Sequence, residues 1–131
     1  MSTLSSLSRA LIAIAAGWQI FFVVLEMIFW TSDRAVRVSG FTNVRPLGGS
    51  IQDTMAGKTQ SLGRNMGLYN GFLAAGLLWG LTLGAAGRPV LVFFLACVIV
   101  AGVYGAATVN RKILFVQALP AVLALAALLF A

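Results

Sequence analysis

The chain has 131 residues, of which 60% are hydrophobic and only 9% are charged. This apolar fraction exceeds what a soluble domain can enclose in one core, so the composition excludes an ordinary soluble protein and predicts an integral membrane protein. The net charge of +6 does not indicate nucleic acid, because the basic residues occupy short connections beside apolar stretches and are not interleaved with aromatics along one face.

The numbers of histidine and cysteine residues restrict the possible functions further. The sequence has no histidine and one cysteine, Cys97, which lies inside an apolar run. Two cysteines are needed for an intrachain disulfide, and zinc and haem sites usually use histidine or several cysteines. We therefore expect no cofactor and no metal, and we find no catalytic signature in the sequence.

Four apolar stretches are long enough to span a bilayer, since a helix needs about 20 residues to cross roughly 30 Å of hydrocarbon. We predict an all-α fold, an integral membrane four-helix bundle that forms a single domain over residues 1–131. The predicted spans cover about 11–30, 68–85, 90–109 and 113–131. For the first span, a cleavable signal peptide is disfavoured because its apolar core would be only about 7 to 15 residues long.

The connection over residues 31–67 is the only long polar stretch. Glycines and prolines break its first half, which predicts irregular backbone there. Ser50 with Asp53 forms a plausible capping box, and apolar residues then recur near helical spacing, at Ile51, Met55, Leu62 and Met66. We therefore expect one short amphipathic helix in this connection, lying at the membrane surface before the second span.

Prolines mark two later changes of direction. Gly87-Arg88-Pro89 predicts a tight turn between the second and third spans, because proline cannot continue the incoming helix. Pro120 lies within the fourth span and removes a backbone hydrogen bond, so we expect a kink about one turn after Gln117.

Glycines recur at intervals of four along the second span. Gly67 with Gly71, and Gly76 with Gly80 and Gly84, form two ridges that allow close backbone approach. The ridges can pack against neighbouring spans of the same chain or against a second copy, so a homodimer stays an open alternative.

The basic residues predict the orientation. Seven of the nine lie in the first and third connections, and the other two, Arg9 and Arg88, lie on the opposite side. Short connections rich in lysine and arginine stay in the cytoplasm. We therefore expect a multi-pass protein of the bacterial inner membrane, with both termini outside the cytoplasm and the lipid bilayer as its surroundings.

Few polar side chains lie within the predicted spans. Gln19 and Glu26 are seven residues apart, so they share a helix face that must point into protein. The helical rise of about 1.5 Å per residue gives the depth of each polar residue below its span end. By this count, Glu26 lies close under the cytoplasmic face, level with polar residues of the other three spans: Tyr69, Asn70, Tyr104, Thr108 and Gln117. Because unpartnered polar groups are costly in hydrocarbon, we predict a polar layer centred on Glu26. The predicted ligand-binding residues are Glu26, Gln19, Asn65, Tyr69, Asn70, Tyr104, Thr108 and Gln117.

Several runs resemble one bacterial family. They are Leu25-Glu26-Met27 with Trp30, the run from Gly67 to Gly76, the run from Cys97 to Ala106, and the run from Ile113 to Gln117 with Pro120-Ala121. Together they resemble the domain of unknown function 1304 family of small membrane proteins. The resemblance implies a four-span fold and no established activity. Members often have Glu-His where this chain has Trp18-Gln19, and Gln where it has Met66, so any chemistry of that histidine would be lost or altered here.

Each signal has a structural alternative. Glu26 could snorkel to the interface or pair with Arg64 or Arg111. Tyr69 and Asn70 could serve only to hold helices together, through interhelical hydrogen bonds that are worth roughly 0.6 to 2 kcal/mol each. Trp30 is typical of an aromatic belt at the membrane surface, whereas Trp18 and Trp79 lie deeper and are candidates for shaping a cavity.

Three function classes fit these observations. We favour a binder or transporter of a small molecule, in which a cationic or hydrogen-bonding ligand displaces a proton from Glu26. The second is a structural or interaction subunit whose polar layer sets helix register. The third is an enzyme that modifies a lipid or isoprenoid, with Glu26 as base and Tyr69 or Tyr104 as acid. The sequence offers this class only one carboxylate and no nucleophile. The expected partners are therefore the bilayer and a small-molecule or lipid ligand, with no nucleic acid.

Overall fold

The computed structural model describes residues 4–32, 49–50 and 54–130. Every regular element among these residues is helical, which confirms the predicted all-α class. The elements are α1 (Ser6–Met27), α3 (Met55–Lys58), α4 (Gln60–Thr82), the 3-10 helix η2 (Gly84–Gly87), α5 (Arg88–Thr108), the π-helix η3 (Leu114–Ala118) and α6 (Leu119–Phe130).

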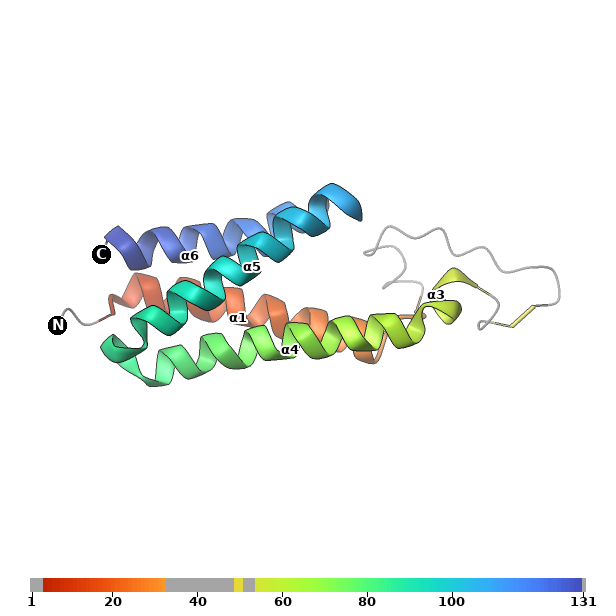
Figure 1. Cartoon of the computed structure of the whole chain (residues 1–131), viewed down its shortest axis with the longest axis horizontal. Coiled ribbons are helices and arrows are strands. Elements are labelled where there is room, and N and C mark those ends of the chain that lie inside the picture. The colour runs from red at the N-terminus through yellow and green to blue at the C-terminus, as the bar shows by residue number, and fades with distance from the viewer. Residues whose placement is uncertain (1–3, 33–48, 51–53, 131) are drawn as a thin grey trace.

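The long helices lie side by side in a cyclic order (Figure 1). α1 packs along α4 and α6, and α5 packs along α4 and α6. Both termini and η2 lie at one end of the molecule, which we call the closed end. The α5–η3 connection and α3 lie at the other, the open end, where α5 diverges from α1 and α4.

The main apolar core fills the closed end. Buried side chains from the four long helices meet there, and they include Ile12, Leu77, Leu91, Leu95, Val98, Ala121, Ala124 and Leu128. The alanines, together with glycines of α4, let the helices approach closely. Toward the open end, the second cluster of buried side chains consists of Phe22 and Leu25, with Val116 packed against them. The core therefore thins where the helices separate.

The two glycine ridges of α4 pack within the chain. A Cβ added at Gly67 would lie 2.5 Å from Met27 Cγ, on α1. One added at Gly80 would lie 2.6 Å from Leu91 Cδ2, on α5, and one at Gly76 would meet the ring of Phe94. Two faces of α4 thus contact two different helices of the same chain, whereas Gly84 of the second predicted ridge lies in η2, where a Cβ would meet nothing within 4 Å.

α4 begins at Gln60, eight residues before the predicted start of the second span at residue 68. The reason is tertiary packing: Gly63 lies directly under the indole ring of Trp30, and the Trp30 Nε1 donates a 3.1 Å hydrogen bond to Thr59 Oγ1. Trp30 is buried, so its interpretation as a membrane-belt residue was wrong.

The predicted amphipathic helix of the first connection falls partly outside the described residues, since Ile51 and Asp53 are not among them. In the described part, α3 is a single turn, and Thr54 Oγ1 accepts a 3.1 Å hydrogen bond from the Gly57 amide at its start. Leu62 and Met66, which we assigned to that helix, belong to α4 instead.

Both proline predictions are modified by the structure. The turn after α4 is made by η2, where Gly84 has a positive φ of 58°, and Pro89 lies in the first turn of α5, where its missing amide hydrogen costs nothing. Before Pro120, the backbone forms the π-helix η3, in which the Leu119 amide donates to the Leu114 carbonyl. Proline cannot donate to the carbonyl four residues earlier, and the wider turn relieves that position.

Two segments of the described residues are long and apolar enough to cross a membrane: Ser6–Met27 and Gly84–Thr108. Leu114–Phe130 is also apolar but shorter. The glycines and the polar first turns of α4 lower its hydropathy. By length and composition, these two helices are candidate membrane spans.

Candidate functional site

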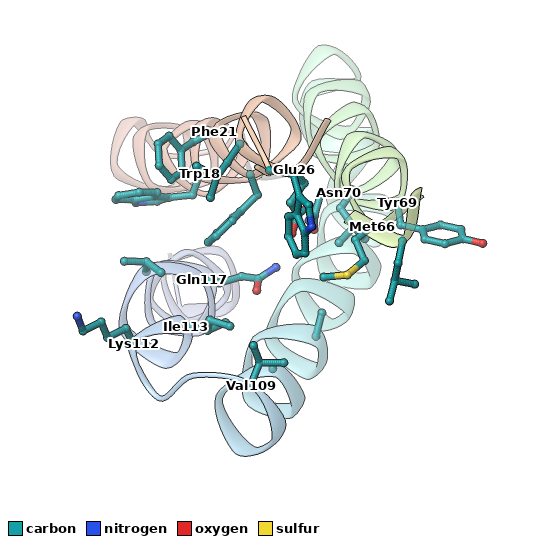
Figure 2. Close-up of a pocket in the computed structure, with 18 of the residues that line it drawn as sticks. Trp18, Phe21, Glu26, Met66, Tyr69, Asn70, Val109, Lys112, Ile113 and Gln117 are labelled. Atoms are coloured by element: carbon teal, nitrogen blue, oxygen red, sulfur yellow. The ribbon is translucent and has the colours of Figure 1, made fainter. Parts of the chain in front are cut away.

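A cavity of about 780 Å³ lies toward the open end, between α1, α4, α5 and η3 (Figure 2). Most of its wall is apolar or aromatic, with a few polar side chains. It is lined by Trp18, Phe21, Phe22, Leu25, Glu26, Trp30, Thr59, Leu62, Met66, Tyr69, Asn70, Leu73, Ala101, Gly105, Val109, Lys112, Ile113, Val116 and Gln117. The cavity exists because the helices diverge beyond the closed-end core.

The acidic group of the cavity is Glu26, in the last turn of α1. It is buried, and its Oε2 accepts a 2.6 Å hydrogen bond from Asn70 Nδ2 of α4. Gly67, one turn before Asn70, lets the two helices approach, because a Cβ there would lie 3.2 Å from the Cβ of Glu26. The close contact between α1 and α4 thus places a carboxyl and an amide together on the cavity wall.

No cationic side chain neutralises Glu26 among the residues that the structure describes. Its hydrogen bond to Asn70 is the polar contact that the carboxyl makes there, and Oε1 accepts none. Arg64 and Arg111, the partners considered from the sequence, are exposed and form no ion pair with it. Lys112 borders the cavity, but Figure 2 shows its nitrogen pointing away from the centre.

A second polar pair lies deeper. Gln117 Nε2, on η3, donates a 3.2 Å hydrogen bond to Gln19 Oε1, on α1. Gln19 is fully buried, and its Nε2 has no hydrogen-bond partner within the described part of the chain. Gln19 and Glu26 are both buried, as their spacing of seven residues predicts. The π-turn places Gln117 where it reaches α1.

Aromatic rings form the α1 side of the cavity. Trp18 and Phe21 meet edge to face with ring centroids 5.5 Å apart, and Phe21 and Phe22 have centroids 5.7 Å apart. Trp30 closes the cavity near the start of α4. Trp79, in contrast, is exposed on the outer face of α4 and takes no part.

The other predicted site residues do not join Glu26. Tyr69 borders the cavity, but its side chain is 58% exposed and its ring points away in Figure 2. Tyr104 is 71% exposed, and Thr108 uses its hydroxyl to donate a 2.7 Å hydrogen bond to the Tyr104 carbonyl. Asn65 is also exposed. The polar layer predicted from depth is thus two separate pairs, Glu26 with Asn70 and Gln19 with Gln117.

The sequence reasoning named Trp18 as a candidate for shaping a cavity, and it missed the rest of the apolar wall. Trp18, Phe22 and Leu25 follow each other at helical spacing beside the Gln19–Glu26 face of α1, and this pattern could have identified them. Val116 and Met66 carried no comparable signal. Among the described residues, no three histidine, cysteine or acidic side chains lie together as a metal site would need.

A comparison of sequences places the chain in a family. The profile of the family described as "Protein of unknown function (DUF1304)" matches residues 13–129. The chain belongs to the DUF1304 family. The resemblance inferred from the sequence runs is confirmed, and the match includes every residue that lines the cavity.

A curated relative gives the same picture. The uncharacterized protein YpaA of Lactococcus lactis subsp. lactis (strain IL1403) is 28% identical over 103 residues, which is 79% of this chain and 87% of the relative. No solved structure matches the chain. Membership of DUF1304 therefore brings no activity with it, and the geometry of the cavity has to carry any functional argument.

Proposed function

We propose that this protein is an integral membrane binder or transporter of small molecules, and that its binding site is the cavity around Glu26. The single observation that carries the proposal is a mainly apolar cavity of about 780 Å³ with a carboxyl and two amides on its wall. Small-molecule sites commonly enclose roughly 300 to 1,000 Å³ and combine apolar walls with a few polar groups that fix orientation.

The membrane setting is part of the proposal. α1, α4, α5 and the η3–α6 segment would each span the bacterial inner membrane, with both termini outside the cytoplasm. Large apolar side chains that are exposed on the outer faces, such as Phe93, Val100 and Phe115, support a lipid environment. The charge bias of the connections supports the orientation. The open end would then face the cytoplasm.

The shape of the cavity suggests how access would work. The four helices pack tightly at the closed end, where Leu77, Leu91 and Leu95 are fully buried. A ligand would therefore enter from the open end. A binding protein needs nothing more, whereas a transporter would have to separate the helices at the closed end during its cycle.

Glu26 would be the group that senses the ligand. A buried carboxylate without a cationic partner is unfavourable, so a proton or a cationic or hydrogen-bonding ligand must neutralise it. Proton and ligand would compete for the same oxygen atoms. Asn70 would hold the carboxyl in place through its hydrogen bond in either state.

A structural subunit without its own ligand is the second candidate. The two hydrogen-bonded pairs favour it, because they tie α1 to α4 and to η3 as register-setting contacts would. A lipid-modifying enzyme is less well supported. Neither Tyr69 nor Tyr104 contacts Glu26, so the acid and base of such a mechanism are not together among the described residues.

A cavity-filling variant separates these candidates. We would measure thermal shifts of the detergent-solubilised protein with a library of small molecules that each carry an apolar body and a donor or cationic group. Val116→Phe fills the cavity, and Leu119→Phe adds the same ring one turn away, outside it. A compound that binds the cavity should raise the thermal midpoint of the wild type and of Leu119→Phe. It should have no effect on Val116→Phe and a smaller effect on Glu26→Gln.

A different result would support the second candidate, a structural subunit without its own ligand. If Glu26→Gln changes the thermal midpoint while no compound distinguishes Val116→Phe from Leu119→Phe, the cavity is not a ligand site. Unchanged binding and transport in Glu26→Gln would also count against a role for the carboxyl.

A further inference from the structure

The chemistry of the cavity restricts its occupant beyond size. Two of its polar atoms that remain unbonded are acceptors close to the buried hydrogen-bonded pairs. Glu26 Oε1 accepts no hydrogen bond among the described residues, and Gln117, whose Nε2 is used for Gln19, has its Oε1 without a donor there. The one side-chain amide donor next to the carboxyl, on Asn70, is already bonded to it. The wall thus offers an occupant two acceptor oxygens, of which the Glu26 oxygen belongs to the acidic group of the site.

The net electrostatics of the wall point the same way. Glu26 is buried at the cavity without a cation among the described residues. Lys112 is exposed, and its nitrogen points away from the cavity centre in Figure 2. In a low-dielectric site, an unpaired carboxylate has a strong preference for a positive charge placed near it.

The aromatic rings add a second attraction. Trp18, Phe21 and Phe22 line the α1 side, and Trp30 lines the same cavity. The face of an aromatic ring is electron-rich and attracts organic cations, most strongly for tryptophan. Apolar side chains of α4 and η3, including Met66 and Val116, complete a wall that suits a bulky apolar body.

We propose that the occupant of the cavity is a lipophilic organic cation, such as an aromatic or alkyl ammonium or phosphonium compound. Its charge lies against Glu26 and the aromatic rings, and its apolar body fills the space between α4, α5 and η3. This inference rests on the proposed function, and it adds the sign of the charge that the site selects. A neutral apolar molecule offers the carboxyl no opposite charge, and an anion is repelled by its ionised form.

Two ions of matched shape and opposite charge test the selection. Tetraphenylphosphonium and tetraphenylborate differ in the sign of one buried central charge. Their binding to the wild-type protein, to Glu26→Gln and to Val116→Phe is measured by isothermal titration in an uncharged maltoside detergent. Glu26→Gln is nearly isosteric and keeps an acceptor oxygen for Asn70, so it tests charge without emptying the site.

We expect the wild type to bind tetraphenylphosphonium saturably, at one site per chain. In Glu26→Gln, the affinity for the cation relative to the anion should fall by about tenfold or more, because the charge pair is lost. Val116→Phe should also lower the affinity for the cation. Thermal stabilisation of the wild type by the cation, but not by the borate, checks the same preference without any variant.

The outcomes separate the two proposals. Equal binding of both ions to the wild type, lost in Val116→Phe, would overturn cation selectivity and leave the cavity as a small-molecule site. Cation selectivity through Glu26 is also overturned if Glu26→Gln leaves the ratio of the two affinities unchanged. If neither ion binds and no library compound distinguishes Val116→Phe from Leu119→Phe, both proposals fail together.

Discussion

Asn70 Nδ2 donates a 2.6 Å hydrogen bond to Glu26 Oε2 and so joins α4 to α1 across 44 residues of sequence. This bond lies on the wall of the cavity, and the carboxyl has no other polar contact among the described residues. The pair therefore serves both the packing of two helices and the chemistry of the candidate site.

Removal of the Asn70 amide should destabilise the protein. Asn70→Leu leaves the Glu26 carboxyl without its donor, and an unsatisfied buried polar group costs about 1 to 3 kcal/mol. The thermal midpoint in detergent should fall. Asn65→Leu is the matched control, since Asn65 is exposed on the same helix, and its effect should stay within about 0.5 kcal/mol. Equal effects of the two substitutions would show that the bond to Glu26 contributes nothing to stability.

The Gln19–Gln117 pair predicts non-additive mutations. Gln117→Leu removes the hydrogen bond to Gln19 and leaves a fully buried amide without a partner, at a cost of about 1 to 3 kcal/mol. The double variant Gln19→Leu with Gln117→Leu removes both amides and should be close to wild type or more stable, because Gln19 Nε2 is unsatisfied already. Unfolding in detergent measures the cycle. Additive losses would mean that the two amides do not interact.

Gly102 should tolerate no side chain. An added Cβ would lie 2.8 Å from the backbone nitrogen of Ala118, so α5 and the π-helix would have to separate. Overpacking of this kind costs about 1 to 3 kcal/mol. Gly17→Ala is the control, because a Cβ at Gly17 meets nothing within 4 Å and alanine favours an exposed helix by roughly 1 kcal/mol. A stability of Gly102→Ala equal to that of Gly17→Ala would contradict the close approach of α5 and η3.

The orientation is testable by labelling. In a Cys97→Ala background, single cysteines replace Ser6, at the closed end, and Ser61, at the open end, both of which are exposed. A membrane-impermeant maleimide should label Ser6→Cys in intact spheroplasts and Ser61→Cys only after the membrane is opened, because basic connections stay in the cytoplasm. The reverse pattern would invert the proposed topology.

The helices could largely be predicted from the sequence, and their boundaries less well. Apolar runs gave the ends of α1 to within five residues and those of α5 to within two. The start of α4 was misplaced because Leu62 and Met66 were assigned to a separate surface helix, whereas the Trp30 ring packs on Gly63 and the first turns of α4 are continuous with the second span. The π-turn before Pro120 depends on how η3 packs against α5, which a single sequence does not contain.

The depth of each polar side chain along its helix was easier to predict than the helix face on which it lies. The helical rise places Tyr69 and Asn70 at the same level, but consecutive residues point about 100° apart around the axis, so both cannot face Glu26. Asn70 faces the carboxyl and Tyr69 faces outward. Tyr104 and Thr108 share a face four residues apart, and that face of α5 is exposed. Which face turns inward is set by the partner helices.

The central claim is a water-accessible cavity around Glu26 that opens to the cytoplasm within a membrane-spanning protein. It is tested most directly with a charged thiol reagent applied to inverted vesicles that carry Val116→Cys or Leu119→Cys in the Cys97→Ala background. Val116 is half-buried and lines the cavity, whereas Leu119 is 46% exposed but lies outside it, where lipid would cover it. Because a charged reagent and a reactive thiolate both need water, Val116→Cys should react about tenfold faster or more. If Leu119→Cys reacts as fast as Val116→Cys, or if Val116→Cys does not react, the account is contradicted.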